Sequence, residues 1–192
     1  DLNAAITNAT SIDVSGTSNL GANVTTSGTQ TYTGNATING NRTLTTTNSN
    51  VTFSGTTNAA SAGDTLTIAA GSGDVTFTGA VGGSTALGNT TITTGALSAA
   101  NMTVQGTISV TNTSSSSITG VIADGASAAI LTKAGSGTLT LSGNNTYTGL
   151  TTINAGTLKV TTNNALGTNA AGTVIGASGT LDLANVTYST TE

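Results

Sequence analysis

Residues Leu131–Val160, LTKAGSGTLTLSGNNTYTGLTTINAGTLKV, decide the fold of this chain. In GTLTLSG the leucines Leu139 and Leu141 alternate with hydroxyl side chains, and a period of two is typical of a strand with one buried and one solvated face. GNN at residues 143–145 breaks the pattern with residues that tolerate left-handed backbone. The alternation restarts at TYTG, TTIN and GTLKV, with glycine or asparagine at each corner. Strands and corners that alternate without room for a helix predict one winding of a solenoid.

A fixed distance separates two near copies of one element, NVTFSG and DVTFTG. Their valines, Val51 and Val75, are 24 residues apart, which is a plausible perimeter for one coil of a three-sided β-helix. We therefore expect Phe53 and Phe77 to stack one coil apart on the same wall, with Tyr32 at the head of the column.

TYTG also occurs twice. Tyr32 is followed six residues later by Ile38, and Tyr147 is followed six residues later by Ile153. This spacing predicts equivalent corners in the two halves of the chain.

Most of the remaining sequence has strand alternation between glycine or asparagine corners. SIDV (Ser11–Val14) is expected to be the first strand, and residues 1–9 a short helical cap or the ragged end of a coil. Residues 114–117 and 126–129 are expected to be loops or slack corners. Further strands are expected in ANVTT, TQTYTG, ATING, RTLTT, TLTIA, NTTITTG, MTVQGTISV, SSSITGVIA and TVIGASGTLDLANVTYS.

Winding explains how parallel strands can follow one another without helices. In a β-helix each strand pairs with the strand one coil further on, and stacking of the coils buries the apolar faces. Equivalent residues then lie about 4.8 Å apart and form ladders of like side chains. The sequence therefore predicts an all-β parallel β-helix (β-solenoid), formed by residues 1–192 as a single segment of a larger repeat protein.

The stretch from residue 131 resembles the passenger-associated repeat of bacterial autotransporters. The likeness continues from ALG at residues 165–167 to GTLDL at residues 179–183, and the first two thirds of the chain more loosely resemble the Thr/Gly-rich repeats of very large haemagglutinin-like adhesins. The resemblance implies a right-handed β-helix at the cell surface of, or secreted by, a Gram-negative bacterium. The matching positions are Leu131, Lys133, Gly135, Gly137, Leu139, Leu141, Gly143, Asn145, Tyr147, Gly149, Thr152, Ile153, Gly156 and Leu158.

Composition excludes several classes of function. The chain has no Cys, Pro, His or Trp, so it has neither a disulfide framework nor a Cys/His metal site. Its basic residues are Arg42, Lys133 and Lys159, and its net charge is −4. Three scattered cations cannot follow a phosphate backbone or an anionic membrane. No apolar run approaches the roughly 20 residues of a membrane helix, and the start, DLNAAITNATS, lacks signal-peptide character, as expected of an internal or processed fragment.

No catalytic, cofactor-binding or metal-binding residue is assigned, and we expect no enzyme. A hydrolase without His or Cys needs a Ser–Lys pair or paired carboxylates. The aspartates are scattered beside corners and strand starts, which indicates turn capping. GSGD at residues 71–74 faintly resembles calcium-binding β-solenoid repeats but occurs once. The aspartates concerned are Asp13, Asp64, Asp74, Asp124 and Asp182.

Two surface patterns have alternative interpretations. N-x-T triplets at Asn23, Asn50 and Asn185 could be glycosylation sites, or they could arise because asparagine is used at corners and threonine on strands. Thr-x-Thr pairs, as in Thr91-Ile92-Thr93, resemble the ice-binding faces of β-solenoid antifreeze proteins. Here NVTF, TISV and AILTK are expected to interrupt such an array.

The predicted function is structural and adhesive, a stalk that holds binding regions away from the cell towards a host surface, a neighbouring cell or a matrix. The alternative is a self-assembling extracellular filament or matrix subunit, whose coil ends associate head-to-tail; sedimentation over a concentration series would reveal it. Less favoured are a carbohydrate-active β-helix enzyme, which needs a groove with three or more close carboxylates, and an ice-binding solenoid. No nucleic acid, no membrane insertion and no cofactor are expected.

Overall fold

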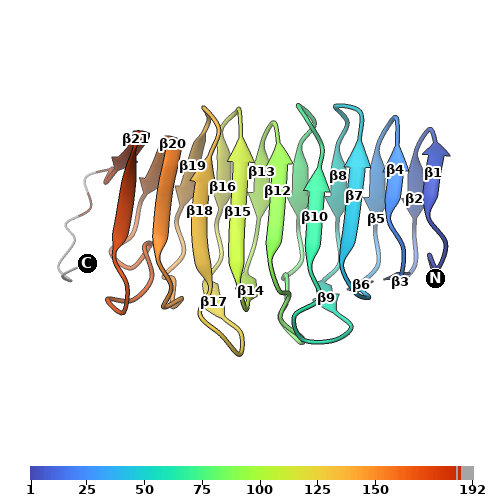
Figure 1. Cartoon of the computed structure of the whole chain (residues 1–192), viewed down its shortest axis with the longest axis horizontal. Coiled ribbons are helices and arrows are strands. Elements are labelled where there is room, and N and C mark those ends of the chain that lie inside the picture. The colour runs from blue at the N-terminus through green and yellow to red at the C-terminus, as the bar shows by residue number, and fades with distance from the viewer. Residues whose placement is uncertain (185, 187–192) are drawn as a thin grey trace.

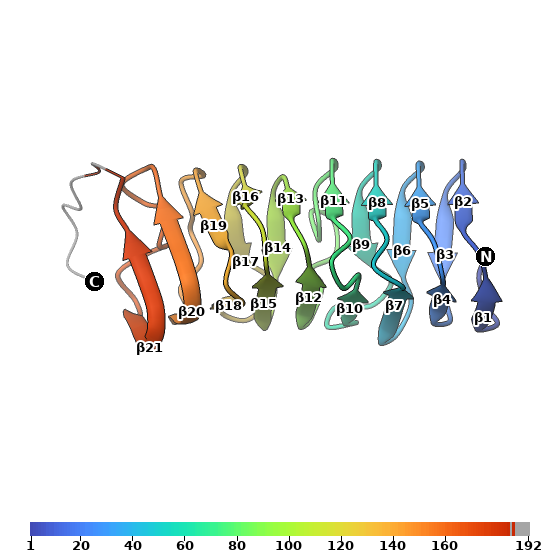
Figure 2. The ribbon, with the colours of Figure 1, turned by 90° about the horizontal axis from the view of Figure 1, so that it is seen from above.

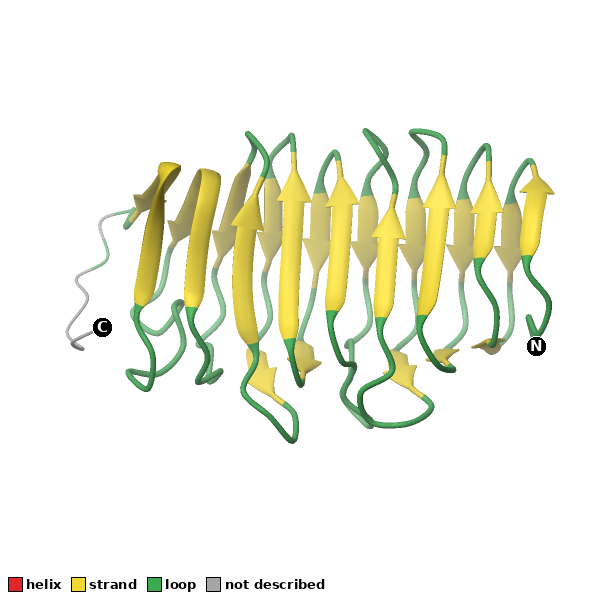
Figure 3. Cartoon of the chain, in the orientation of Figure 1, coloured by secondary structure: helices red, strands yellow, loops and turns green. Residues whose placement is uncertain are grey.

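A computed structural model describes residues 1–184 and 186. These residues form strands, turns and loops but no helix (Figure 3), so far-ultraviolet circular dichroism should show sheet alone. No helix in the described part of the chain is long and apolar enough to cross a membrane.

The strands stack in three walls around one axis (Figures 1 and 2). The first wall contains β1 (Ile6–Ala9), β4 (Val24–Thr26), β7 (Arg42–Thr46), β10 (Leu66–Ala69), β12 (Thr90–Thr94), β15 (Thr107–Asn112) and β18 (Ile130–Ala134). The second wall contains β2 (Ile12–Val14), β5 (Gln30–Tyr32), β8 (Val51–Phe53), β11 (Val75–Phe77), β13 (Leu97–Ala99), β16 (Ser116–Ile118) and β19 (Thr138–Leu141). The third wall contains β3 (Ser18–Leu20), β6 (Ala36–Ile38), β9 (Thr57–Ala59), β14 (Met102–Val104) and β17 (Ile122–Asp124).

Two ten-residue strands complete the stack, β20 (Thr151–Val160) and β21 (Thr173–Asp182). β20 pairs with β18 through its first half and with β19 through its second half, so it joins the first and second walls. All pairings are parallel. In Figure 1 the first-wall strands run upward in front while the chain advances from right to left, which makes the winding right-handed. The predicted right-handed parallel β-helix is confirmed.

Coil length varies along the stack. Val24 pairs with Ile6, and Val75 pairs with Val51, so one coil has 18 residues and the other has 24. Apart from a shift between β1 and β4, neighbouring strands β4 to β18 of the first wall pair in register, while the connections that pass along the third side differ in length. Figure 1 shows two of these connections as projecting loops near β9 and β17. The 24-residue period inferred from NVTFSG and DVTFTG is therefore correct for that coil and not for every coil.

An aromatic column fills the core behind the second wall. Phe53 and Phe77 pair in register and stack with ring centroids 5.1 Å apart and an interplanar angle of 7°. Tyr32 stacks on Phe53 at 4.8 Å. All three rings are buried, and the predicted column with Tyr32 at its head is confirmed.

Glycine allows the coils to approach at the corner between the second and third walls. A Cβ at Gly34 would lie 2.4 Å from the backbone of Gly16, and a Cβ at Gly55 would lie 2.6 Å from the backbone of Gly34. Gly79 continues this ladder, with Gly55 at 2.4 Å. A side chain at these corners would force adjacent coils apart, so the recurrent S-G and T-G pairs mark places of closest approach.

Three expectations about local structure were wrong. The N-terminal segment is not the helical cap but belongs to a coil, which was the other alternative, because Ile6–Ala9 pairs in parallel with β4. SIDV was expected to be the first strand and is the second. TYTG at residues 146–149 forms no strand, whereas the first TYTG begins in β5. Ile38 lies on the third wall and Ile153 on the first, so the shared six-residue spacing does not reflect equivalent corners.

Candidate functional site

Asparagine side chains connect successive coils at the exposed corners. Asn50 Oδ1 accepts a hydrogen bond from the backbone N–H of Asp74 at 2.8 Å, and Asn23 Oδ1 accepts one from Thr43 N at 2.9 Å. The same contact to the next coil recurs at Asn35, Asn41, Asn48, Asn58, Asn89 and Asn101. These contacts give two of the N-x-T triplets a structural role, while Asn185 lies outside the described residues.

The aspartates are spread along the stack and cap backbone groups. Asp74 Oδ1 accepts from Ala96 N at 2.9 Å, and Asp64 Oδ2 accepts from Ser61 N at 2.9 Å. Asp182 Oδ1 accepts from Ala184 N at 2.9 Å. Asp13 lies on the outer face of β2. In residues 1–184 and 186, no three Asp, Glu, His or Cys side chains come together.

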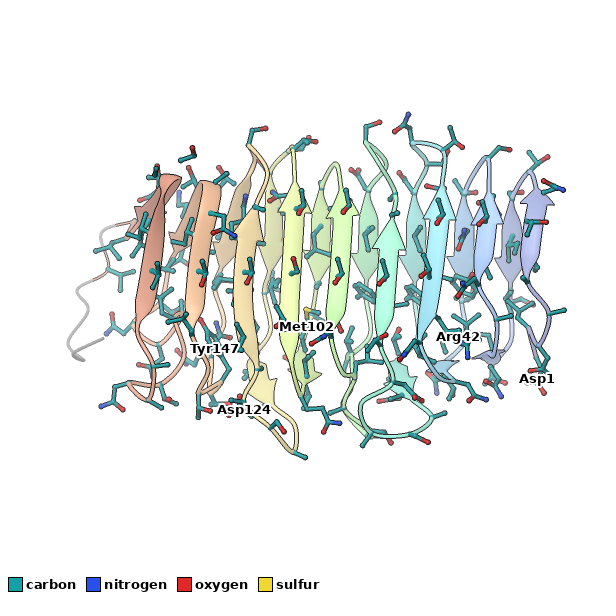
Figure 4. The ribbon with its side chains drawn as sticks, in the orientation of Figure 1. Asp1, Arg42, Met102, Asp124 and Tyr147 are labelled. Carbon is teal, nitrogen blue, oxygen red and sulfur yellow. The ribbon has the colours of Figure 1, made fainter. Side chains whose placement is uncertain are left out.

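Asp124 is the most extensively bonded carboxylate. It lies at the end of β17 on the lower edge of the stack (Figure 4). Its Oδ1 accepts from Ala129 N at 2.8 Å and from Thr148 N at 3.1 Å, and its Oδ2 accepts from Thr148 Oγ1 at 2.7 Å. The carboxylate therefore organises the loop at residues 125–129 and fastens it to the next coil.

The GSGD stretch is a corner between the first and second walls. Gly71 has a φ of 62°, Ser72 N donates to Asn48 Oδ1, and one carboxylate oxygen of Asp74 is engaged by the next coil. A hard cation needs several convergent oxygens, and the neighbouring corner offers Asn50 rather than a second carboxylate. The geometry thus supports a structural corner.

A shallow hollow lies at the upper edge of the first coils, and its lining has no charged side chain. Its lining contains hydroxyl, amide and methyl groups and no carboxylate, unlike the acid-lined groove that a carbohydrate-cleaving enzyme requires. The lining residues are Thr7, Asn8, Ala9, Thr25, Thr26, Ser27 and Thr47.

Polar side chains face inward at the corner between the first two walls. Asn112 is fully buried, and its Nδ2 donates to Ser114 O at 2.6 Å, to Ser116 Oγ at 2.9 Å and to Thr138 O at 2.9 Å. Ser116 Oγ also accepts from Leu97 N at 2.8 Å. The serine run expected to be a slack loop thus begins as an exposed corner and continues as strand β16, with Ser116 bonded inside the core.

Lys133 is the buried cation of this corner. Its position two residues after Leu131 in β18 points it inward, and its side chain is fully buried. Nζ donates to Ala134 O at 2.6 Å, to Gly135 O at 3.0 Å and to Ala155 O at 3.2 Å. Burial lowers its pKa from the ordinary 10.5 to about 8, so the ammonium is still charged at neutral pH. Such charge-assisted bonds are strong, and here they join two coils.

Asn145 likewise connects adjacent coils, but on the third side, where residues 142–150 form no strand. Its Oδ1 accepts from Ile122 N in the preceding coil at 2.7 Å, and its Nδ2 donates to Ala165 O in the following coil at 2.5 Å. The side chain is buried, whereas that of Asn144 is exposed. Neither this role nor the burial of Asn112 was inferred from sequence, although alternation from a neighbouring buried residue would have indicated an inward position for Asn112.

The first wall presents a two-column array of hydroxyl groups, called here the hydroxyl face. NVTF lies on the second wall, and TISV begins strand β15, which places Ser109 and Thr111 in the same two columns. The expected interruptions are thus fewer: Ala69 and Ala134 stand in one column only. One column contains Thr43, Thr67, Thr91, Ser109, Thr132 and Thr152; the other contains Thr25, Thr45, Thr93 and Thr111.

Comparison with known proteins identifies one segment. Residues 131–160 match the family model described as passenger-associated-transport-repeat. No curated protein and no solved structure matches the chain. The matched segment contains Lys133 and Asn145, two of the buried side chains that join coils, and it is the stretch in which the sequence itself resembles autotransporter passengers. A passenger-associated-transport-repeat within a right-handed β-solenoid fits an autotransporter passenger-like stalk.

Proposed function

We propose that this segment is the stalk of a bacterial surface adhesin, a stiff spacer that holds binding regions away from the cell. The observation that carries the proposal is the unbroken stack with its passenger-associated-transport-repeat at residues 131–160. The seven first-wall strands together with β20 and β21, at about 4.8 Å per step, give a rod of roughly 40 Å. Longer arrays of the same coil would extend the reach in proportion.

The bonds between coils support a spacer rather than a flexible linker. Backbone pairing, asparagine contacts at the corners and buried amides each connect a coil to the next, so bending the rod would break several bonds at once. The composition also suits export in the unfolded state, because the chain has no disulfide and no proline isomerisation to complete before it winds. The proposed partner is a host surface, a neighbouring cell or an extracellular matrix, and the proposed location is the surface of a Gram-negative bacterium.

Surface display tests this proposal. The 192 residues would be fused to an outer-membrane anchor and a distal epitope tag, with the anchor and tag alone as the control. We expect the purified chain to be a rod in electron micrographs, and the displaying cells to attach better to matrix-coated surfaces or cell layers. Globular particles in the micrographs would contradict the proposal that this segment is a stalk. Rods without any gain in attachment would overturn the adhesive role of this segment.

A second candidate function, binding of an ice surface, is favoured by the hydroxyl face. Within the described part of the chain, the hydroxyl groups of this face form no intramolecular hydrogen bonds, and the outward side chains carry no charge. The repeat of about 4.8 Å between strands and about 6.6 Å along them is regular in two directions. Ordered hydroxyl and methyl groups of this kind can hold a layer of ordered water.

A matched pair of substitutions tests the ice-binding candidate. Thr91→Lys places a charge in the middle of the hydroxyl face, whereas Thr76→Lys changes an equally half-buried threonine on the second wall, which has one outward column. Enrichment of the native chain in slowly grown ice, lost in the first variant and kept in the second, is the expected result. Equal exclusion of the native chain and both variants from ice would rule out ice binding.

A further inference from the structure

Asn39-Gly40 differs from the asparagine corners that connect successive coils. It connects β6 to β7 and is the only Asn-Gly pair in the sequence. The Asn39 side chain is exposed and makes no hydrogen bond to the described residues, whereas the corner asparagines above each accept one from the next coil. The backbone N–H of Gly40 is likewise without an acceptor among these residues.

We propose that Asn39-Gly40 is a self-modifying site that loses ammonia spontaneously and becomes Asp or isoaspartate. The Gly40 amide nitrogen, having lost its proton, attacks Asn39 Cγ. A bond forms between these atoms, the Cγ–Nδ2 bond breaks, and ammonia leaves. Water then opens the resulting succinimide at either carbonyl, which gives Asp or isoaspartate at position 39. The reaction requires water and no other reagent.

Arg42 is placed to promote the first step. Its Nε donates to the backbone oxygen of Asn39 at 2.5 Å. That oxygen belongs to the peptide group whose nitrogen is the nucleophile, so a charged donor there withdraws electron density and makes the Gly40 N–H more acidic. Nη2 also lies against Gly40, 2.4 Å from where a Cβ would be. Figure 4 shows Arg42 at the lower end of β7.

Glycine at position 40 removes the usual obstacles to ring closure. Gly40 has a φ of 79°, in the left-handed region that favours glycine, and it presents no Cβ to the approaching Asn39 side chain. Position 39 follows the last residue of β6, so its side chain is outside the strand ladder.

The Asp-Gly pair of the chain, Asp124-Gly125, is protected from succinimide formation by its hydrogen bonds. Asp124-Gly125 could form the same succinimide, with loss of water. Its carboxylate, however, accepts three hydrogen bonds, and Gly125 N donates to Val104 O at 2.9 Å. The nucleophile and the electrophile are thus both held. The structure therefore predicts reaction at position 39 without reaction at position 124.

The product would change the local charge. A carboxylate at position 39 lies three residues before Arg42 and can pair with its guanidinium, so this corner acquires an ion pair. Isoaspartate adds a backbone carbon to the connection between the third and first walls. The site would mark the age of the molecule after export.

Incubation of the purified chain at mildly alkaline pH tests the proposal, with ammonia release and peptide mass spectrometry as readouts. Modification should accumulate at residue 39 ahead of every other asparagine, while peptides containing Asp124-Gly125 stay free of isoaspartate. Arg42→Gln should slow the reaction and Arg42→Lys should restore part of the rate, with circular dichroism to verify that both variants remain folded. Asn39→Gln should abolish the early ammonia release.

Two outcomes would overturn the inference. If residue 39 reacts no faster than the exposed Asn144, the free corner is not a reactive site. If Arg42→Gln reacts at the native rate while folded, Arg42 does not promote the step. Unfolding the chain in urea serves as the reference, because the Arg42 effect should disappear when its contact with Asn39 is lost.

Discussion

Replacing Phe53 by alanine is expected to lower the free energy of unfolding by about 3–5 kcal/mol, the range for large aromatic truncations in protein cores. Phe53 is the middle ring of the column, with Tyr32 at 4.8 Å on one side and Phe77 at 5.1 Å on the other. Truncation removes both stacking contacts and leaves a cavity that the flanking backbone ladders keep from closing. Urea unfolding followed by circular dichroism measures the change.

Thr52→Ala is the matched control, because Thr52 is in the same strand but points outward. It should change the free energy of unfolding by less than about 0.5 kcal/mol, as is usual for surface positions. A loss below about 1 kcal/mol in Phe53→Ala would contradict the prediction and show that the coils close around the vacated space.

The aromatic column was predictable because two copies of one sequence show directly which residues pair with each other. NVTFSG and DVTFTG give the same residue at each inward position, so their pairing follows once winding is assumed. The two TYTG stretches share only a corner composition. Every wall begins and ends with the same small residues, so a corner motif cannot identify the wall, and only pairing in space places Tyr32 on the second wall and Tyr147 on the third side.

The Thr-x-Thr pattern of the surface was misjudged because, here too, the sequence does not show which wall a strand belongs to. Alternation predicts which residues of a strand point outward, but not which strands share a wall. NVTF was therefore counted as an interruption of the Thr-x-Thr array although it lies on the second wall. The length of the third-side connections, which varies from coil to coil, decides this assignment, and no periodicity encodes it.

The buried polar groups were the least accessible to sequence reasoning. Lys133 was treated as a repeat position, yet the alternation from Leu131 already puts it inside. What alternation does not reveal is how the buried charge is compensated. Two of the carbonyl oxygens around Nζ belong to the next two residues, Ala134 and Gly135, but the third, that of Ala155, comes close only after winding. Asn145 is a stronger case, because its partners are 23 residues earlier and 20 residues later.

Asn145→Ala is expected to lower the free energy of unfolding by about 2–4 kcal/mol, because two buried backbone groups each lose a partner at roughly 1–3 kcal/mol. The Ile122 N–H loses its acceptor and the Ala165 carbonyl loses its donor. The third side has no strand at residues 142–150, and the remaining contacts between coils here are single backbone bonds such as Thr146 N to Ile122 O. Asn144→Ala, which removes an exposed amide from the adjacent position, is the control and should be nearly neutral.

Hydrogen exchange separates this mechanism from a general loss of stability. The Ile122 amide should exchange faster in Asn145→Ala even under conditions in which the Phe53–Phe77 region stays protected, because stability in a stacked solenoid is local to adjacent coils. Thermal or urea unfolding would provide the global value. Unchanged protection of Ile122, together with a loss of stability below about 1 kcal/mol, would mean that a water molecule replaces the amide and that backbone pairing alone holds the passenger-associated-transport-repeat in the stack.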